Sequence, residues 1–221
     1  YTFEGNADDD IGANNGKIYS AELDTGICES KSYSFNGVSS FIECGNDKSL
    51  NGRFNGFSIS LWVKPKTIIT NNLSTIIAKW AFDPLKDHFG MWLDMNYRVI
   101  FAVSEPRAME NGIFGVTQLT PDKWYHIVGT WNMNKEIRIY VNGNVDKIGW
   151  QTGSGINFQS EATLKIGRQV IRKDRPYRGI VIVRSTEDFP RSIDDGTIIA
   201  ASEAGFVTSD GRTYSFDPVG Q

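Results

Sequence analysis

Apolar and polar residues alternate along most of the chain, which is the period-two pattern of half-buried β-strands. In the clearest run, Phe57–Lys64, one face carries Phe57, Ile59, Leu61 and Val63, and the other carries two serines and a tryptophan. Other runs are shorter but follow the same pattern. We expect further strands at Tyr1–Glu4, Ser32–Phe35, Phe41–Cys44, Thr75–Trp80, Phe89–Asp94, Arg98–Ser104, Leu164–Gly167 and Tyr177–Arg184.

The strongest pairing prediction concerns three successive alternating runs, Lys123–Asn132, Glu136–Val141 and Val145–Trp150. The last two are separated by Asn142-Gly143. Asn-Gly favours a type I′ turn, whose two central residues need positive φ, and this turn joins antiparallel strands. We therefore predict that these runs form neighbouring antiparallel strands.

The overall pattern predicts an all-β fold. No segment has the periodicity of an ordinary amphipathic helix, and strands recur at short intervals with turn residues between them. The 22 glycines in 221 residues fit many tight turns. This combination is typical of a two-sheet antiparallel β-sandwich or jelly roll.

Charge and hydropathy argue against two classes of partner. The formal net charge is −3 and no basic stripe stands out in the sequence, so nucleic acid and anionic membrane surfaces are poor candidates. No apolar run reaches the roughly 18 residues that a membrane span needs, so we predict no membrane insertion.

The two cysteines, Cys28 and Cys44, predict a disulfide. If Ser32–Phe35 and Phe41–Cys44 fold into a hairpin, the chain brings Cys28 close to Cys44. A disulfide would place the protein in an oxidising compartment. The alternative is two buried free thiols. The cysteines and the scattered histidines form no zinc-ligand pattern.

Five segments, in chain order, resemble the laminin-G-like domains of the concanavalin-A-like lectin and glucanase jelly rolls. They are the acidic opening Tyr1–Asp10, the hairpin Ser34–Glu43, the strand Phe57–Pro65, the paired segments Lys123–Trp131 and Ile139–Gly143, and Leu164–Gly167. The resemblance covers roughly residues 1–170 and implies a concanavalin-A-like jelly roll. It also implies a non-catalytic binding module of a secreted or cell-surface protein.

The resemblance divides the chain at residue 179. Residues 1–179 form the expected jelly-roll domain, and residues 180–221 form C-terminal strands. Ile180–Ser185 replaces the acidic final strand of the family, and Gly179–Phe216 is similar to part of a fibronectin type III module. These strands either complete the sandwich or form a partial module of that kind.

The densest group of oxygen ligands is Asp8-Asp9-Asp10 with Asn6. Calcium takes six to eight oxygens, often from neighbouring carboxylates. The resemblance implies that Asp9 matches an acidic residue that binds calcium in related jelly rolls, so calcium is a candidate cofactor. The alternative is a solvated acidic turn.

Aromatic residues near predicted strand ends are the candidate ligand contacts, because a flat ring can hold the apolar face of a sugar. The expected aromatic contacts are Trp80, Phe82, Trp92, Tyr97 and Trp150, and the expected polar contacts are Asp87, Asp94, Asn96 and Arg107. The polar loop Glu105–Gly115 is expected to border the site. We expect Trp62, Trp124 and Trp131, which lie inside regular strands, to pack in the core or between the sheets.

The sequence argues against catalysis. Concanavalin-like glycosidases carry alternating carboxylates on one strand, and no such run occurs here; Glu187-Asp188 and Asp194-Asp195 are adjacent, so their side chains would point to opposite faces. His126 lies within an alternating strand and is expected to be a structural sheet histidine; His88 is either a ligand contact or has no role.

The first hypothesis is therefore an extracellular module that binds a glycan or a surface glycoprotein. An adhesion or assembly module, contacting other domains of a larger surface protein, is the alternative. A glycoside hydrolase is the second alternative.

Overall fold

The computed structural model describes residues 1–51, 55–66, 73–81, 88–104, 112–151 and 160–168, and the backbone of short strands beyond them. The chain separates into two compact units, Tyr1–Ile171 and Arg172–Gln221. In the second unit, β14 (Ile182–Arg184) pairs with β15 (Thr197–Ala200), and β16 (Phe206–Val207) pairs with β17 (Thr213–Tyr214). The boundary at residue 179 and the fibronectin-like character of the last strands stay predictions.

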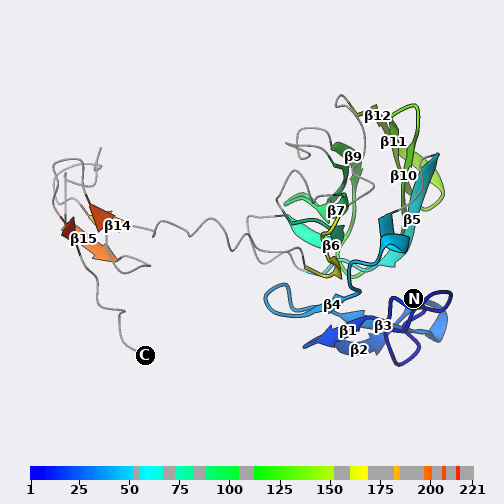
Figure 1. Cartoon of the computed structure of the whole chain (residues 1–221), viewed down its shortest axis with the longest axis horizontal. Coiled ribbons are helices and arrows are strands. Elements are labelled where there is room, and N and C mark those ends of the chain that lie inside the picture. Colours follow the sequence, from blue (N-terminus) through cyan, green and yellow to red (C-terminus); the bar gives the residue numbers. More distant parts are fainter. Residues whose placement is uncertain are drawn as a thin grey trace. The chain divides into compact units, whose positions relative to one another are not determined.

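The first unit is built from antiparallel sheets (Figure 1), which confirms the predicted all-β sandwich. The seven-stranded sheet contains, in spatial order, β1 (Lys17–Tyr19), β4 (Phe41–Glu43), β13 (Leu164–Ile166), β6 (Ser74–Lys79), β7 (Phe89–Leu93), β8 (Arg98–Val103) and β9 (Ile113–Gln118). The four-stranded sheet contains β12 (Asn144–Trp150), β11 (Glu136–Val141), β10 (Tyr125–Asn132) and β5 (Gly56–Val63). A separate ribbon pairs β2 (Glu22–Thr25) with β3 (Lys31–Ser34).

The main core lies between the two sheets. The inward residues of β10 and β11, among them Ile127, Trp131 and Ile139, are buried and pack with Met91 and Phe101 from the larger sheet. These residues occupy alternate positions, as the period-two pattern predicts. A fully buried side chain of this size contributes about 1.5–3 kcal/mol to folding, so the core dominates stability.

The predicted hairpin is confirmed. β11 ends at Val141 and β12 begins at Asn144, with Asn142 and Gly143 between them. Their φ values are 50° and 80°, both positive, as a type I′ turn requires. This turn sets the register that places β12 at the edge of the four-stranded sheet.

Asp146 of β12 links the edges of the two sheets. Its carboxylate accepts hydrogen bonds from the backbone N–H groups of Val116 and Thr117 on β9, each at 3.0 Å. An added Cβ at Gly115 would lie 2.3 Å from the same carboxylate, so only glycine leaves room for this contact. The carboxylate thus satisfies two donors of an edge strand that would otherwise need water.

Several sequence-based expectations about where strands begin and end were wrong. Tyr1–Glu4 forms no strand, whereas β1 and β2 were not predicted. Both are short, with three and four residues, which leaves little alternation to detect. The loop expected over Glu105–Gly115 does not extend to Gly115, because β9 begins at Ile113.

The predicted disulfide between Cys28 and Cys44 is absent. Both cysteines are free thiols, with Cys28 exposed and Cys44 buried. The expectation assumed that the segments before and after Asn36 form one hairpin. Instead, β3 pairs with β2, and β4 pairs with β1 and β13, so the two segments belong to different sheets.

Lys79 at the end of β6 is fully buried, and its ammonium group donates to the backbone carbonyls of Ser160 (3.4 Å) and Ala162 (2.5 Å). Burial lowers the pKa of Lys79 to about 8, because the charged form loses its hydration. The two carbonyls fix the segment before β13 against β6. The interaction therefore stabilises the sheet at the cost of a buried charge.

We predict that the native chain gains stability relative to a Lys79→Met variant as pH rises from 7 to 10. A lysine whose folded pKa is lowered carries its full penalty below pH 8, and the penalty is relieved toward the ordinary lysine pKa near 10.5. The gain should be about 2 kcal/mol. Urea unfolding of both proteins at each pH measures it. A difference between the two proteins that does not change with pH would contradict the prediction.

Candidate functional site

The outer face of the seven-stranded sheet carries two of the predicted ligand contacts, Trp80 and Trp92. Their rings meet edge to face with centroids 5.4 Å apart, and the side chains are 2% and 0% exposed. They pack in a cluster with alanines of β6 and β8 and with Ile100. A Cβ at Gly90 would lie 2.0 Å from the Trp92 ring, so that ring rests directly over the glycine backbone. Neither indole offers a ring face to solvent.

Three further predicted contacts, the polar Asp94 and Asn96 and the aromatic Tyr97, lie in the turn between β7 and β8. The Asp94 carboxylate accepts backbone N–H bonds from Asn96 (2.8 Å) and Arg98 (2.9 Å) and forms an ion pair with the Arg98 guanidinium at 2.7 Å. Burial alone would raise the Asp94 pKa, but the bonds from Arg98 and Asn96 outweigh it and lower the pKa. This carboxylate is committed to its own turn. Phe82, Asp87 and Arg107 lie outside the described residues.

The three aspartates of the acidic opening serve three separate networks. Asp8 accepts from Asn6, and Asp10 pairs with the N-terminal amine at 3.1 Å. Asp9 accepts backbone N–H bonds from Gly12, Asn14 and Ile11, which lower its pKa to about 2.

Asp9 therefore acts as the centre of a turn. No group of three or more His, Cys, Asp or Glu in the described part of the chain is placed to hold a metal ion. Calcium binding by Asp8, Asp9 and Asp10 stays a prediction.

The outer face of the four-stranded sheet is the more open aromatic surface. Strand register places side chains from β5, β10, β11 and β12 in rows across this face. Its two tryptophans, Trp62 and Trp150, are 51% and 64% exposed. Solvent-facing positions of an antiparallel sheet are usually polar, so exposed indoles here need an explanation.

Trp62 stands at one end of this face, against His126 of the neighbouring strand. The two residues are directly paired, and their ring centroids are 5.1 Å apart at an angle of 38°. Ser60 lies one row further along, and its hydroxyl is 2.8 Å from the His126 Nε2 atom. The histidine ring thus contacts both the Ser60 hydroxyl and the Trp62 indole, and it packs against one side of the indole.

A polar strip lies between the two tryptophans. Arg138 donates from Nε to the Glu136 carboxylate at 2.8 Å and contacts the Tyr140 hydroxyl at 3.5 Å. The Arg138 hydrogen bond is the main reason that the Glu136 pKa is lowered. Glu136 also accepts from Asn132 at 3.3 Å. The strip therefore presents fixed donors and acceptors on a flat surface.

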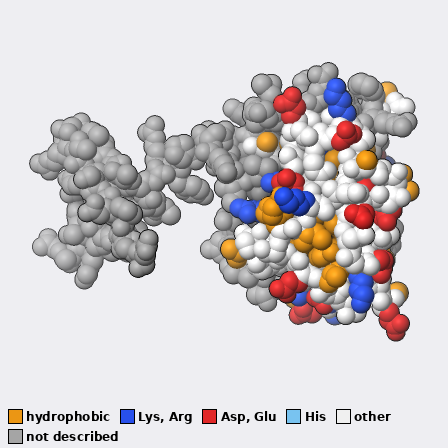
Figure 2. All heavy atoms as spheres, turned by 60° about the horizontal axis from the view of Figure 1, so that its bottom comes forward, with side chains coloured by type: hydrophobic (Ala, Val, Ile, Leu, Met, Phe, Trp, Pro, Cys, Tyr) orange, Lys and Arg blue, Asp and Glu red, His pale blue; other side chains and the backbone are white. Residues whose placement is uncertain are grey.

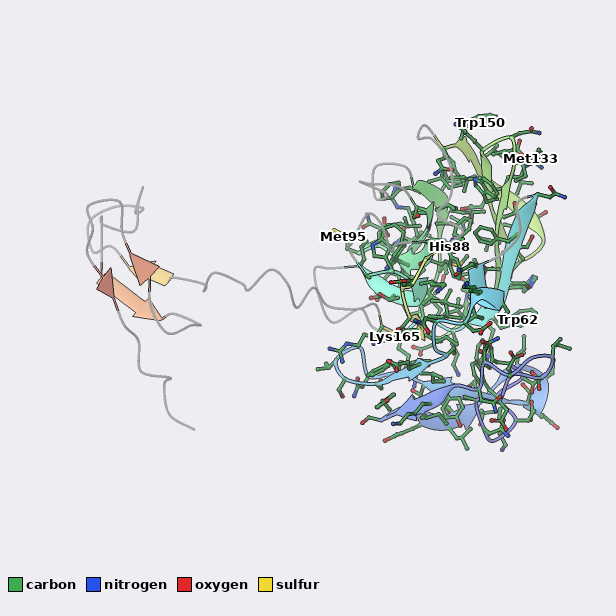
Figure 3. The ribbon with its side chains drawn as sticks, viewed as in Figure 1. Trp62, His88, Met95, Met133, Trp150 and Lys165 are labelled. Atoms are coloured by element: carbon green, nitrogen blue, oxygen red, sulfur yellow. The ribbon has the colours of Figure 1, made fainter. Side chains whose placement is uncertain are left out.

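Trp62 and Trp150 lie at opposite ends of the sandwich (Figure 3). The strand register separates Trp62 from Trp150 by three strands and by three successive side chains on the same face. These separations correspond to about 14 Å across the sheet and about 20 Å along it. A single small ligand does not reach both rings. Only an extended ligand could contact both.

The sequence found one of these tryptophans and missed the other. Trp150 was a predicted ligand contact, and its exposure agrees with that role, which remains a prediction. Trp62 was expected to pack between sheets, and this expectation was wrong, whereas Trp131 is buried as expected. The alternation of Phe57–Lys64 did place Trp62 opposite the core face. Nothing in the sequence showed that this second face is uncovered.

Comparison with known proteins defines the class. A family model described as the concanavalin A-like lectin/glucanases superfamily matches residues 36–182, about two thirds of the chain. The chain therefore belongs to this superfamily. Among the described residues, no helix is long and apolar enough to cross a membrane.

The matched relatives are much larger proteins. Botulinum neurotoxin type F of Clostridium botulinum is 34% identical over 116 residues, and the type C toxin is 26% identical over 126 residues. These segments are 47% and 53% of this chain but only 9% of each toxin.

Solved structures share the fold at low identity. Domain 4 of AbnA, an extracellular arabinanase of Geobacillus stearothermophilus solved with arabinotriose, has a TM-score of 0.58 at 19% identity, over 77% of this chain and 82% of that one. The binding domain of Paraclostridial Mosquitocidal Protein 1 has a TM-score of 0.56 at 18% identity, over 70% of this chain and 39% of that one. A structure of botulinum neurotoxin type C, described in connection with cell entry that depends on two ganglioside molecules, has a TM-score of 0.52 at 18% identity. The match covers 72% of this chain and 39% of that one.

We predict that acrylamide quenches the fluorescence of Trp62 and Trp150 but not that of Trp80 and Trp92. Replacing either exposed tryptophan by Phe should lower the quenchable fraction, because its indole is open to solvent. The same replacement at Trp80 or Trp92 is the matched control: it should leave the intensity of the quenchable emission unchanged and raise the quenchable fraction, because only inaccessible emission is lost. Loss of quenchable emission in Trp92→Phe would show that the seven-stranded sheet carries the open face.

Proposed function

We propose that this chain is a non-catalytic carbohydrate-binding module and that Trp62 is its main sugar contact. The observation that carries the proposal is the indole of Trp62, half exposed on a flat sheet face and held in place by His126. An exposed ring that is already oriented loses little freedom when a ligand stacks on it. That is the property expected of a sugar platform.

The surroundings of Trp62 suit a ligand with many hydroxyl groups. In the row next to Trp62, Ser60 of β5 pairs with Val128 of β10, and both side chains are much smaller than the indole. The Ser60 hydroxyl and the His126 ring lie beside it and can each donate or accept a hydrogen bond. An apolar ring next to a few fixed polar groups is the usual composition of a small-ligand site.

The comparisons support a glycan as the ligand class. One structural neighbour was solved with arabinotriose, and another concerns a toxin whose entry depends on gangliosides. The arabinanase is described as extracellular, and we extend that location to this chain as part of the proposal. Calcium is not needed at Trp62, because the acidic opening belongs to a different part of the fold.

The described carboxylates support a binding role over hydrolysis. A glycosidase needs two carboxyl groups on either side of the scissile bond. Glu136 of β11 pairs with Arg138, Glu43 of β4 with Lys165, and Asp94 of the turn between β7 and β8 with Arg98. Each of these carboxylates is already neutralised by a cation in its own network, which leaves it poorly suited to act as an acid or a nucleophile.

An adhesion module is the second candidate, because an apolar strip follows the closed edge of the sandwich. Val145, Ile148 and Trp150 of β12 are 52%, 38% and 64% exposed, and Phe114 and Val116 of β9 are 44% and 66% exposed. The two strands lie side by side through the Asp146 hydrogen bonds. Exposed apolar side chains on two neighbouring strands often mark a protein contact.

We predict that a glycan array detects binding by the full chain and that Trp62→Ala weakens it about tenfold or more, as expected for loss of an aromatic anchor. Trp62→Phe should keep part of the affinity, because a smaller ring remains. Val38→Ala, which shortens a 73% exposed side chain in a loop, is the control and should bind normally. Titration calorimetry with the strongest array glycan measures the affinities, in calcium and again in EDTA.

Three outcomes would contradict the proposal. If a folded sample binds no glycan on the array, the adhesion module is favoured. Glycan binding that survives Trp62→Ala but is lost in Trp150→Ala would move the site to the other end of the face. Release of reducing ends from the bound glycan would establish catalysis instead.

A further inference from the structure

A second aromatic surface lies on the outer face of the seven-stranded sheet, at β1, β4 and β13. Tyr19 and Phe41 are direct cross-strand partners, and their rings stack with centroids 4.5 Å apart and planes within 12°. Both residues are only partly buried. Figure 2 shows charged and hydrophobic side chains gathered together on this side of the molecule. The two rings form the centre of what we call the cation–ring cluster.

Three cations surround the stacked pair. The Lys17 ammonium lies 5.2 Å from the Tyr19 ring centroid, and Lys165 and Arg168 lie 4.9 Å and 5.4 Å from that of Phe41. All three are within the distance at which a ring attracts a cation.

One acid belongs to this cluster. Glu43 pairs with Lys165 at 3.1 Å, and it stands in register between Lys17 and Lys165. Within the part of the chain that the structure describes, Lys17 and Arg168 form no ion pair. The cluster therefore has a local charge of about +2, in a chain whose net charge is −3.

Rings and carboxylates hold cations with different consequences. A carboxylate neutralises the cation that it binds, whereas a ring restrains the cation and leaves its full charge available. Lys17 and Lys165 flank Glu43 on neighbouring strands, so two inter-strand spacings place their backbones about 10 Å apart. The result is a net charge of about +2 on a rigid sheet, in which Lys165 alone of the three cations has a described carboxylate partner.

We infer that the cation–ring cluster binds the acid groups of a polyanionic glycan, one that carries sulfate or carboxylate groups along its length. The inference rests on the proposed function only in taking a glycan as the partner. Its residues are on the other sheet from Trp62, so the two sites can be tested separately. Spaced charges on a flat face fit a linear acidic chain. A membrane contact would favour rings free to enter the bilayer, and here cations cap both rings.

The test is titration of the full chain with heparin-derived oligosaccharides and with oligogalacturonate, and with dextran as a neutral probe. We expect Lys17→Ala and Lys165→Ala each to weaken acidic-probe binding about three- to tenfold, the value of one charge-assisted contact. Rising sodium chloride should weaken binding by the native chain. Lys147→Ala removes an equal charge from β12 and is the matched control, expected to bind like the native chain.

The Phe41→Leu variant tests whether binding depends on the arrangement of the cluster and not only on its net charge. It keeps every cation and most of the apolar volume but removes the ring that restrains Lys165 and Arg168. We expect it to weaken acidic-probe binding about threefold or more, since the freed side chains must be ordered again on binding. Thermal unfolding of each variant confirms that it is folded, and Tyr19→Leu repeats the test at the other ring.

Three results would overturn the inference. They are equal losses in Lys147→Ala and Lys17→Ala, normal acidic-probe binding by Phe41→Leu and Tyr19→Leu, and binding to phosphatidylcholine–phosphatidylserine vesicles in preference to either acidic oligosaccharide. An array that detects no glycan at all would instead count against the proposed function. Glycan binding that depends on Trp62 but not on Lys17 or Lys165 would contradict the inference about the cation–ring cluster and leave the proposed function standing.

Discussion

The contact between the inner faces of the two sheets is the interaction on which the rest of the structure depends. Residues such as Ile127 and Ile139 face Phe101 and Met91 across the sandwich, and all of them are buried. Because side chains alternate along a strand, burying one set necessarily presents the other set on an outer face. The exposure of Trp62 and the stacking of Tyr19 on Phe41 both follow from this packing.

The two outer faces use aromatic rings differently because their surroundings differ. Trp80 and Trp92 are buried in an apolar cluster, where they contribute packing energy. Trp62 contacts His126 on an open sheet face, and half of its side chain remains exposed. Phe41 is partly buried, but its neighbours are cations, and the ring restrains charge. The same class of side chain therefore lies in a packed cluster, on an exposed sheet face or beside a group of cations, according to its neighbours.

The sequence predicts the fold well where strands are long and alternate clearly. β5, β10, β11 and the Asn142-Gly143 turn follow from local pattern alone. The disulfide prediction was wrong because it required knowledge of which strands pair, and β3 and β4 join different sheets. The cation–ring cluster was invisible for the same reason. Lys17 and Lys165 are far apart in the chain and do not form a basic stripe until β4 brings β1 and β13 together.

Asp146 has a consequence for the behaviour of the protein at high concentration. An unpaired edge strand offers backbone donors to which another chain can add, and this addition is a common start of aggregation. The carboxylate occupies two of those donors on β9 and places a negative charge beside an apolar strip. One side chain thereby reduces the risk of edge-to-edge polymerisation at the border where exposed Val116 and Ile148 would otherwise promote it.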